Sequence, residues 1–146
     1  MVLRPVEVLI IDDNPGDVAL IRESFRECSL QPRLIAAHDA EQAFELLDDP
    51  QREPPSLIIL DVNLPCTDGL EVLRRIRADP HWNPVPVVIM SSSTRPAEVG
   101  RAYDLHANAY IEKPSDLEAY FDIARGIVTL WLEPLAARVA SSRVTA

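Results

Sequence analysis

The chain has 146 residues, 47% of them hydrophobic, and a formal net charge of −9. This length suits one domain with its own core and is too short for a second folded module. The negative charge argues against nucleic-acid binding, because a phosphate backbone would repel such a surface. The apolar run near the N-terminus meets Asp12 and Asp13 too soon for a signal peptide or a membrane span. We therefore expect a cytoplasmic protein that binds neither nucleic acid nor membrane.

Short apolar runs recur along the chain at intervals of roughly 25 residues, the spacing of a strand, a helix and two loops. The first, third and fourth runs are almost wholly Val, Ile and Leu, which is typical of strands buried on both faces of a parallel sheet. The second and fifth are shorter or more mixed, which is typical of edge strands. The predicted strands are residues 6–11, 33–37, 57–60, 87–90 and 109–111.

Apolar residues at helical spacing fill the segments between these strands. The first helix should begin at Asn14 or Pro15, and the second should follow Asp39 as its N-cap. The third should end before Pro80, and a long last helix should run from Asp116 to about Leu132. This alternation predicts an α/β fold, an open parallel sheet with helices on both faces and right-handed crossovers.

Polar residues follow the predicted strands at the edge where such sheets bind ligands. They are Asp12 and Asp13 after the first strand, Asp61 and Asn63 after the third, Ser91 after the fourth, and Glu112 and Lys113 after the fifth. Lys113 is the only lysine among the 14 basic residues. The carboxylates of Asp12, Asp13 and Asp61 would repel one another unless a cation lies among them, and oxygen ligands without His or Cys suit Mg²⁺. Mg²⁺ beside a carboxylate, a lysine and a hydroxyl has the parts for phosphoryl transfer onto the carboxylate.

Three motifs together resemble those of response-regulator receiver domains. They are Val8-Leu9-Ile10-Ile11-Asp12-Asp13-Asn14, then Asp61-Val62-Asn63-Leu64-Pro65 with Asp68-Gly69 after it, and Lys113-Pro114. The resemblance covers about residues 6 to 130. It implies a single doubly wound (βα)5 flavodoxin-like domain with a five-stranded parallel sheet of order 2-1-3-4-5. It also implies that a sensor histidine kinase donates a phosphoryl group to the chain in a Mg²⁺-dependent reaction.

The resemblance assigns the phosphoacceptor and the metal ligands. Asp61 resembles the aspartate that accepts the phosphoryl group and also contacts the metal ion. Asp12 and Asp13 resemble the acidic pair, with Asp13 as the more direct ligand. Asn63 would contribute its backbone carbonyl to the same ion.

The resemblance also assigns the residues that respond to phosphorylation. Lys113 matches the lysine that pairs with the phosphoryl group, and Ser91 the hydroxyl that moves toward it. Tyr110 matches the aromatic residue that swings inward behind that hydroxyl. Ser92 and Ser93 depart from the alanine and variable residue of many receivers, but their small side chains leave room for a phosphoryl group. The expected readout is a change in the face formed by the fourth helix, fifth strand and fifth helix.

The last third of the chain is similar to a narrower group, the stand-alone response regulators that pair with bacterial phytochromes. The segments that carry this likeness are Tyr103-Asp104-Leu105-His106-Ala107-Asn108-Ala109-Tyr110 and Trp131-Leu132-Glu133. We expect residues 1–135 to form the receiver with an extended last helix, residues 136–146 to form a tail, and no output domain to follow.

The predicted last helix has two apolar stripes. One should cover the sheet, and its members are Leu117, Tyr120 or Phe121, Ala124, Val128, Trp131 and Leu135. The second stripe is Ile123, Ile127 and Leu130. A helix that is apolar on two faces either lies deep or meets a partner. We therefore expect a homodimer with this second stripe in its interface.

Other classes of protein remain open at this point. A pseudo-receiver would bind partners without being phosphorylated. An aspartate-nucleophile phosphohydrolase of the haloacid dehalogenase type needs a second acid two residues after the nucleophile, where this chain has Asn63. A flavodoxin needs a phosphate loop after the first strand, where Asp12 and Asp13 would repel the phosphate. We expect signalling rather than turnover of an external substrate.

Overall fold

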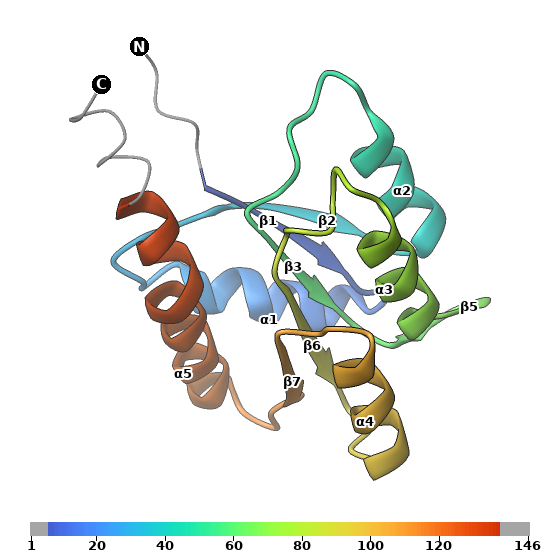
Figure 1. Cartoon of the computed structure of the whole chain (residues 1–146). Helices are drawn as coiled ribbons and strands as arrows, with labels where there is room; N and C mark the ends of the chain where they lie inside the picture. Colours follow the sequence, from blue (N-terminus) through green and yellow to red (C-terminus); the bar gives the residue numbers. More distant parts are fainter. Residues whose placement is uncertain (1–5, 138–146) are drawn as a thin grey trace.

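The structure, a computed structural model, describes residues 6–137 and is built around a parallel sheet. The strands of this sheet are β1 (Glu7–Ile11), β2 (Arg33–Ala37), β3 (Leu57–Leu60), β6 (Val87–Ser91) and β7 (Ala109–Glu112). Their spatial order is β2-β1-β3-β6-β7, which is 2-1-3-4-5 when these strands alone are counted (Figure 1). The predicted fold class is therefore confirmed. Residues 138–146 of the predicted tail lie outside the described residues.

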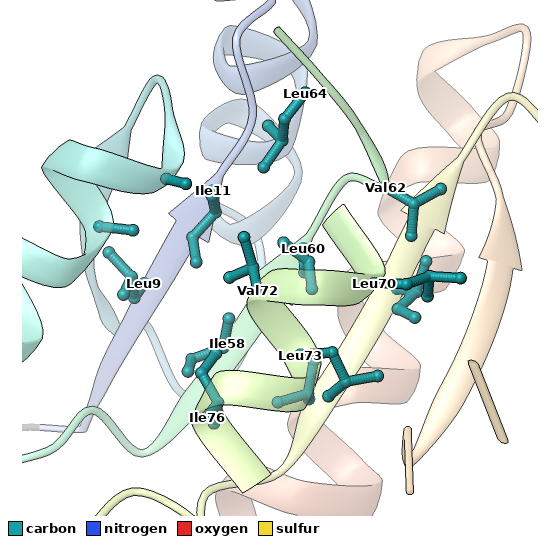
Figure 2. Close-up of a cluster of buried hydrophobic side chains, with 14 of the residues drawn as sticks. Leu9, Ile11, Ile58, Leu60, Val62, Leu64, Leu70, Val72, Leu73 and Ile76 are labelled. Atoms are coloured by element: carbon teal, nitrogen blue, oxygen red, sulfur yellow. The ribbon is translucent and has the colours of Figure 1, made fainter. Parts of the chain in front are cut away.

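Helices cover both faces of the sheet (Figure 1). Their bounds are α1 (Pro15–Phe25), α2 (Ala40–Asp48), α3 (Gly69–Ala78), α4 (Pro96–Asp104) and α5 (Leu117–Ile127). Alternate residues of the central strands point to opposite faces: Ile58 packs with α2 and α3, while Ile59 packs with α1 and α5. Figure 2 shows the first of these cores, between the sheet and α3. Within residues 6–137, none of the helices has the length and apolar character needed to cross a membrane.

Capping side chains fix where most of these helices begin. Asn14 accepts a hydrogen bond from the backbone N–H of Asp17, and Asp39 does the same for Gln42. Both caps agree with the sequence analysis. Asp68 and Asp116 cap α3 and α5 in the same way. α1, α3 and α5 therefore begin near the edge of the sheet where the parallel strands end.

A small hairpin follows β3 and was not predicted from the sequence. It pairs β4 (Asn63–Leu64) with β5 (Thr67–Asp68), and its turn is made by Pro65 and Cys66. Cys66 has a left-handed φ of 60°, the conformation that the third position of a type II turn requires. Strands this short lack a periodicity that sequence analysis could detect.

Gly69 allows α3 to begin directly against the end of β3. A Cβ atom at this position would lie 2.3 Å from the Cα of Val62 and 2.6 Å from the carbonyl oxygen of Asp61. The Gly69 N–H donates a 2.9 Å hydrogen bond to the Val62 carbonyl. The first turn of α3 therefore supports the backbone that carries Asp61, and any larger residue would push the two apart.

The last helix corrects part of the predicted interface stripe. α5 continues into a π-helical turn, η1 (Val128–Leu132), and then into helical residues 133–137. Ile127 is only 2% exposed and packs in the core with α1, so it is not available to a partner. The buried face is wider than the predicted stripe, because Ile127 lies about one turn after Ala124 and two turns after Tyr120, both of which are buried. Leu130 is 66% exposed.

Arg77 of α3 binds the loops at the N-terminal ends of β6 and β7, away from the carboxyl ends of the strands. Its guanidinium donates to the carbonyl of His106 at 2.8 and 3.0 Å, and to those of Asn83 at 3.1 Å and Val85 at 2.7 Å. It also donates to the side-chain oxygen of Asn108 at 2.9 Å, and that oxygen accepts the N–H at the start of β6. One side chain therefore connects α3, the loop before β6 and the loop between α4 and β7.

Candidate functional site

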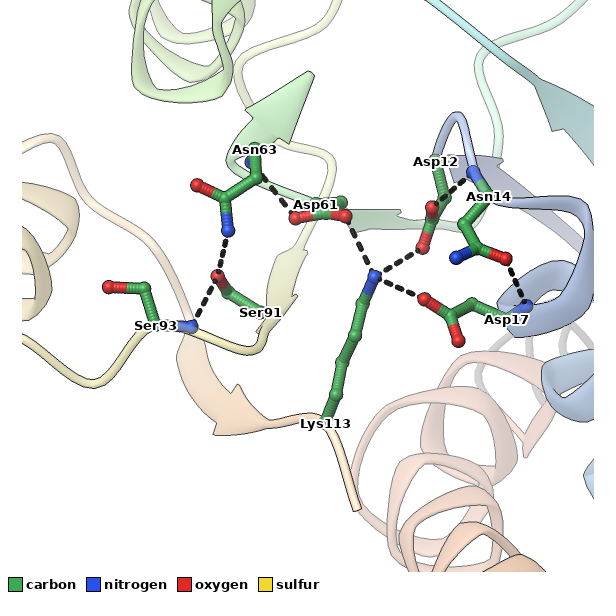
Figure 3. Close-up of polar contacts among 8 residues, drawn as sticks. All are labelled: Asp12, Asn14, Asp17, Asp61, Asn63, Ser91, Ser93 and Lys113. Carbon is green, nitrogen blue, oxygen red and sulfur yellow. Dashed lines mark hydrogen bonds and ion pairs between the residues drawn. The ribbon is translucent and has the colours of Figure 1, made fainter. Parts of the chain in front are cut away.

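The carboxyl ends of the four neighbouring strands β1, β3, β6 and β7 bring the predicted site residues together (Figure 3). Asp12 follows β1 and Asp61 follows β3, and their exposed fractions are 4% and 5%. Ser91 is the last residue of β6 and is fully buried. Lys113 directly follows β7. The convergence expected from the strand order is present in the structure.

The ammonium of Lys113 lies at the centre of a group of carboxylates. Its Nζ is 2.7 Å from Asp61 Oδ2, 3.0 Å from Asp12 Oδ2 and 2.7 Å from Asp17 Oδ2 (Figure 3). Burial alone would lower the pKa of Lys113, but hydrogen bonds to Asp17, Asp61 and Asp12 outweigh it. The pKa of Lys113 is therefore raised, and the side chain is a fixed positive charge beside Asp61.

Asp17 is a site residue that the sequence analysis missed. It lies in the first turn of α1, where an acidic residue is common because it complements the helix dipole. Its sequence position therefore carries no distinctive signal. Only the packing of α1 against the strand ends reveals that its carboxylate reaches Lys113.

Asp12, Asp13 and Asp61 form a candidate metal centre. Each offers a carboxylate oxygen, and these oxygens lie within 4.8 Å of one another. Burial raises the pKa of Asp12, although hydrogen bonds from the Asn14 N–H and from Lys113 oppose the shift. A divalent cation would offset the negative charge of the three carboxylates. A set of oxygen ligands suits hard cations such as Mg²⁺. The residues present therefore fit a divalent metal ion.

Asn63 connects the two central polar side chains. Its backbone N–H donates to Asp61 Oδ1 at 2.9 Å, and its side-chain amide donates to the Ser91 hydroxyl at 3.1 Å (Figure 3). The backbone bond orients the Asp61 carboxylate through Oδ1, while Lys113 contacts its Oδ2. The predicted contribution of the Asn63 carbonyl to a metal ion stays a prediction.

The Ser91 hydroxyl also connects the site to α4 and β7. It accepts the backbone N–H of Ser93 at 3.1 Å, and the Ser93 hydroxyl donates to Glu98 of α4 at 2.6 Å. The Tyr110 hydroxyl donates to the Ser93 carbonyl at 2.7 Å. Ser93 is therefore the common partner of Ser91, α4 and β7.

A (βα)5 fold with a cluster of carboxylates and a lysine at the carboxyl ends of its parallel strands defines a class of signalling protein. Residues 8–125 match the family model of the response regulator receiver domain, and the chain belongs to this family.

Its relatives include the response regulator Rcp1 of Synechocystis sp., which is 34% identical over 133 residues that cover 88% of this chain and 90% of Rcp1. Two solved structures are similar with a TM-score of 0.80. One is the phosphorylated cyanobacterial phytochrome response regulator RcpA, which is 34% identical, with coverage of 88% of this chain and 95% of that one. The other is the Mn²⁺-bound form of Rcp1, which is 33% identical, with coverage of 88% and 96%. The chain is thus a receiver related to phytochrome response regulators.

Proposed function

We propose that the chain is a phosphorylation switch in which Asp61 accepts a phosphoryl group from a sensor histidine kinase with the help of Mg²⁺. The observation that carries this proposal is the environment of the Asp61 carboxylate. It is buried, accepts the Asn63 N–H on Oδ1 and contacts the Lys113 ammonium through Oδ2. It also belongs to the trio of carboxylates that fits a divalent ion.

The proposed chemistry is an in-line displacement at phosphorus. A carboxylate oxygen of Asp61 forms a new P–O bond while the P–N bond of the donor's phosphohistidine breaks, and the leaving imidazole takes up a proton. Lys113 offsets negative charge on the phosphoryl oxygens. Asp12, Asp13 and the backbone carbonyl of Asn63 would hold the Mg²⁺ ion together with Asp61. The bound ion supplies the remaining positive charge that the transferring group needs.

The proposed signal begins when the phosphoryl group draws the Ser91 hydroxyl toward it. The hydroxyl would then leave the Asn63 amide and the Ser93 N–H that it now contacts. The loop after β6 would move, and Tyr110 would follow into the vacated space, which reshapes the face made by α4, β7 and α5. Phosphorylation shifts the populations only as far as its contacts differ between the two states. In Ser91→Ala we therefore expect Asp61 to be phosphorylated without the full change in this face.

The relatives of the chain support a proposal about which kind of kinase donates the phosphoryl group. Because similar proteins are named as phytochrome response regulators, we propose a phytochrome-type histidine kinase as the phosphodonor. The chain would act in the cytoplasm as a regulator, and its own phosphorylation and dephosphorylation would be its only chemistry. The net charge of −9 disfavours nucleic acid as a partner.

We also propose that the chain forms a homodimer through the face made by α4, β7 and α5. Leu130 is 66% exposed, Leu117 is 38% exposed and Ile123 is partly buried. The last helix, α5 with its continuation η1, therefore presents apolar surface outward. Burial of such surface against a second copy would remove it from water. The interface residues of the revised proposal are Ile123 and Leu130, without Ile127.

The deciding experiment for the switch is the intact mass of the chain after incubation with Mg²⁺ and acetyl phosphate. We expect one hydroxylamine-labile phosphoryl adduct on the native chain and none on Asp61→Asn. An adduct on both chains would show that another residue is the acceptor. No adduct on a folded native chain would favour a pseudo-receiver, and steady release of phosphate from an external phosphoester would favour a phosphohydrolase.

A further inference from the structure

We propose that Asp17 is the positioning residue of Lys113, holding its ammonium in place when a metal ion and a phosphoryl group engage the other two carboxylates. This inference rests on the proposed function of Asp61. It adds a residue of α1 to a site otherwise built from strand ends.

Lys113 uses all of its donors on carboxylates. An ammonium has three N–H groups, and its nitrogen lies within hydrogen-bond distance of Asp12, Asp17 and Asp61. Asp12 and Asp61 belong to the trio whose oxygens lie within 4.8 Å of one another, whereas Asp17 does not. Metal binding and phosphorylation would therefore change two of the three partners of Lys113 and leave Asp17 as it is.

Asp17 is well placed to keep this contact. Its backbone N–H is bonded to the capping oxygen of Asn14 at 3.1 Å, which fixes the first turn of α1 next to the site. The side chains of Lys113 and Asp17 are only 12% and 25% exposed, so water competes weakly for their ion pair. The lysine side chain carries its ammonium on a flexible stem of four carbons. One permanent partner therefore keeps this ammonium beside Asp61.

The role of Asp17 should appear in the rate of phosphorylation. A charge-assisted hydrogen bond contributes enough that its loss changes a rate by roughly tenfold. We expect Asp17→Ala to accept a phosphoryl group from acetyl phosphate about tenfold more slowly than the native chain at saturating Mg²⁺. Asp17→Asn, which keeps an acceptor oxygen but loses the charge, should fall between the two.

The sequence offers a direct readout of the ammonium, because Lys113 is its only lysine. Labelling lysine with ¹⁵N at Nζ gives a single resonance, which can be recorded with the chain alone and with Mg²⁺ plus beryllofluoride as a phosphoryl analogue. The native chain should give a sharp, slowly exchanging ammonium signal in both states. In Asp17→Ala the signal should broaden or disappear in the loaded state.

A matched control removes one negative charge next to Lys113 without touching its ammonium. Glu112→Gln serves this purpose, because Glu112 is exposed and precedes Lys113 directly. Its ammonium signal and its phosphorylation rate should match those of the native chain. If Asp17→Ala fails to fold by circular dichroism, Asp17→Asn takes its place with the same expected direction.

The outcomes separate this inference from the proposed function. A native-like ammonium signal in the loaded Asp17 variants would overturn the positioning role, even if Asp61 is phosphorylated. Equal loss of signal in Glu112→Gln would also overturn it, because a general charge effect would then suffice. If the native chain forms no adduct with acetyl phosphate and its ammonium signal does not change with beryllofluoride, the proposed function itself fails.

Discussion

The Tyr110 hydroxyl donates a 2.7 Å hydrogen bond to the backbone carbonyl of Ser93, two residues beyond Ser91. Ser93 in turn donates its N–H to the Ser91 hydroxyl and its own hydroxyl to Glu98. Burial raises the pKa of Tyr110, so the phenol stays protonated and remains a donor at neutral pH. The loop after β6 is thus fixed both from β7 and from α4.

Replacement of Tyr110 by Phe tests this connection. The variant keeps the ring but leaves the Ser93 carbonyl without its donor, which should lower the free energy of unfolding by about 1 kcal/mol. Phosphorylation of Asp61 should persist, whereas amide hydrogens of residues 92–95 should exchange faster with solvent. Hydrogen exchange measured by mass spectrometry would decide the point. Exchange at native rates would mean that the bond does not order the loop.

Gly69 gives a prediction about stability with an internal control. In Gly69→Ala the new methyl group meets the backbone of Asp61 and Val62, and such overpacking should cost about 2 kcal/mol. In Gly100→Ala the methyl group meets nothing within 4 Å, and the better helix former should stabilise α4 by about 1 kcal/mol. Urea unfolding of both variants measures the two effects. Similar changes in the two variants would contradict the account of Gly69.

Asp12 gives a prediction about pH. Burial raises its pKa above the ordinary value of 3.8, so the folded chain binds this proton more tightly than the unfolded chain. The free energy of unfolding should therefore fall as pH rises from about 3.8 through the raised pKa. The pKa of Lys113 is raised above 10.5, so its contribution stays constant across this window.

Asp12→Asn should remove this part of the pH dependence. It should also raise the free energy of unfolding at pH 7 without metal by about 1 kcal/mol, because the raised pKa of Asp12 means that folding disfavours its charged carboxylate. Urea unfolding at several pH values in the presence of a chelator measures both effects. Asp104→Asn, at an exposed position at the end of α4, is the control. A variant less stable than the native chain at pH 7 would contradict the prediction.

The two apolar residues Leu130 and Ile127 should behave oppositely. Leu130→Glu places a charge on an exposed position, so it should shift a dimer toward monomer with little change in the stability of the fold. Ile127→Ala empties a core position and should cost about 2–5 kcal/mol. Sedimentation equilibrium and urea unfolding distinguish the two. If Leu130→Glu leaves the oligomeric state unchanged, the proposed interface is wrong.

Most of the fold could be predicted because the central strands of the sheet are buried on both faces. The runs at residues 57–60 and 87–90 are apolar throughout, and such runs stand out from the helical periodicity around them. The residues after four neighbouring strands then converge by topology alone, which is why Asp12, Asp61 and Lys113 were found together. The parts that could not be predicted depend on close packing rather than on periodicity.

Asp17 and Ile127 illustrate that limit. An acidic residue in the first turn of a helix is common, so nothing in the sequence separates Asp17 from an ordinary dipole partner. The position of Ile127 depends on how wide a face α5 buries against the sheet and α1, and a pattern of apolar residues does not give that width. The hairpin after β3 was missed because its strands are only two residues long.

The five hydrogen bonds of Arg77 have a mechanical consequence for α4. They fix the carbonyl of His106, just after the C-terminal end of α4, to α3 and to the loop before β6. The N-terminal end of α4 is attached instead to Ser93 through Glu98, and so to the residues around Asp61. The C-terminal end of this helix is therefore fixed to α3, whereas its N-terminal end is attached to the loop beside the site. A small displacement of the loop after β6 would therefore tilt α4. The N-terminal end of the helix, beside Arg95, would move most.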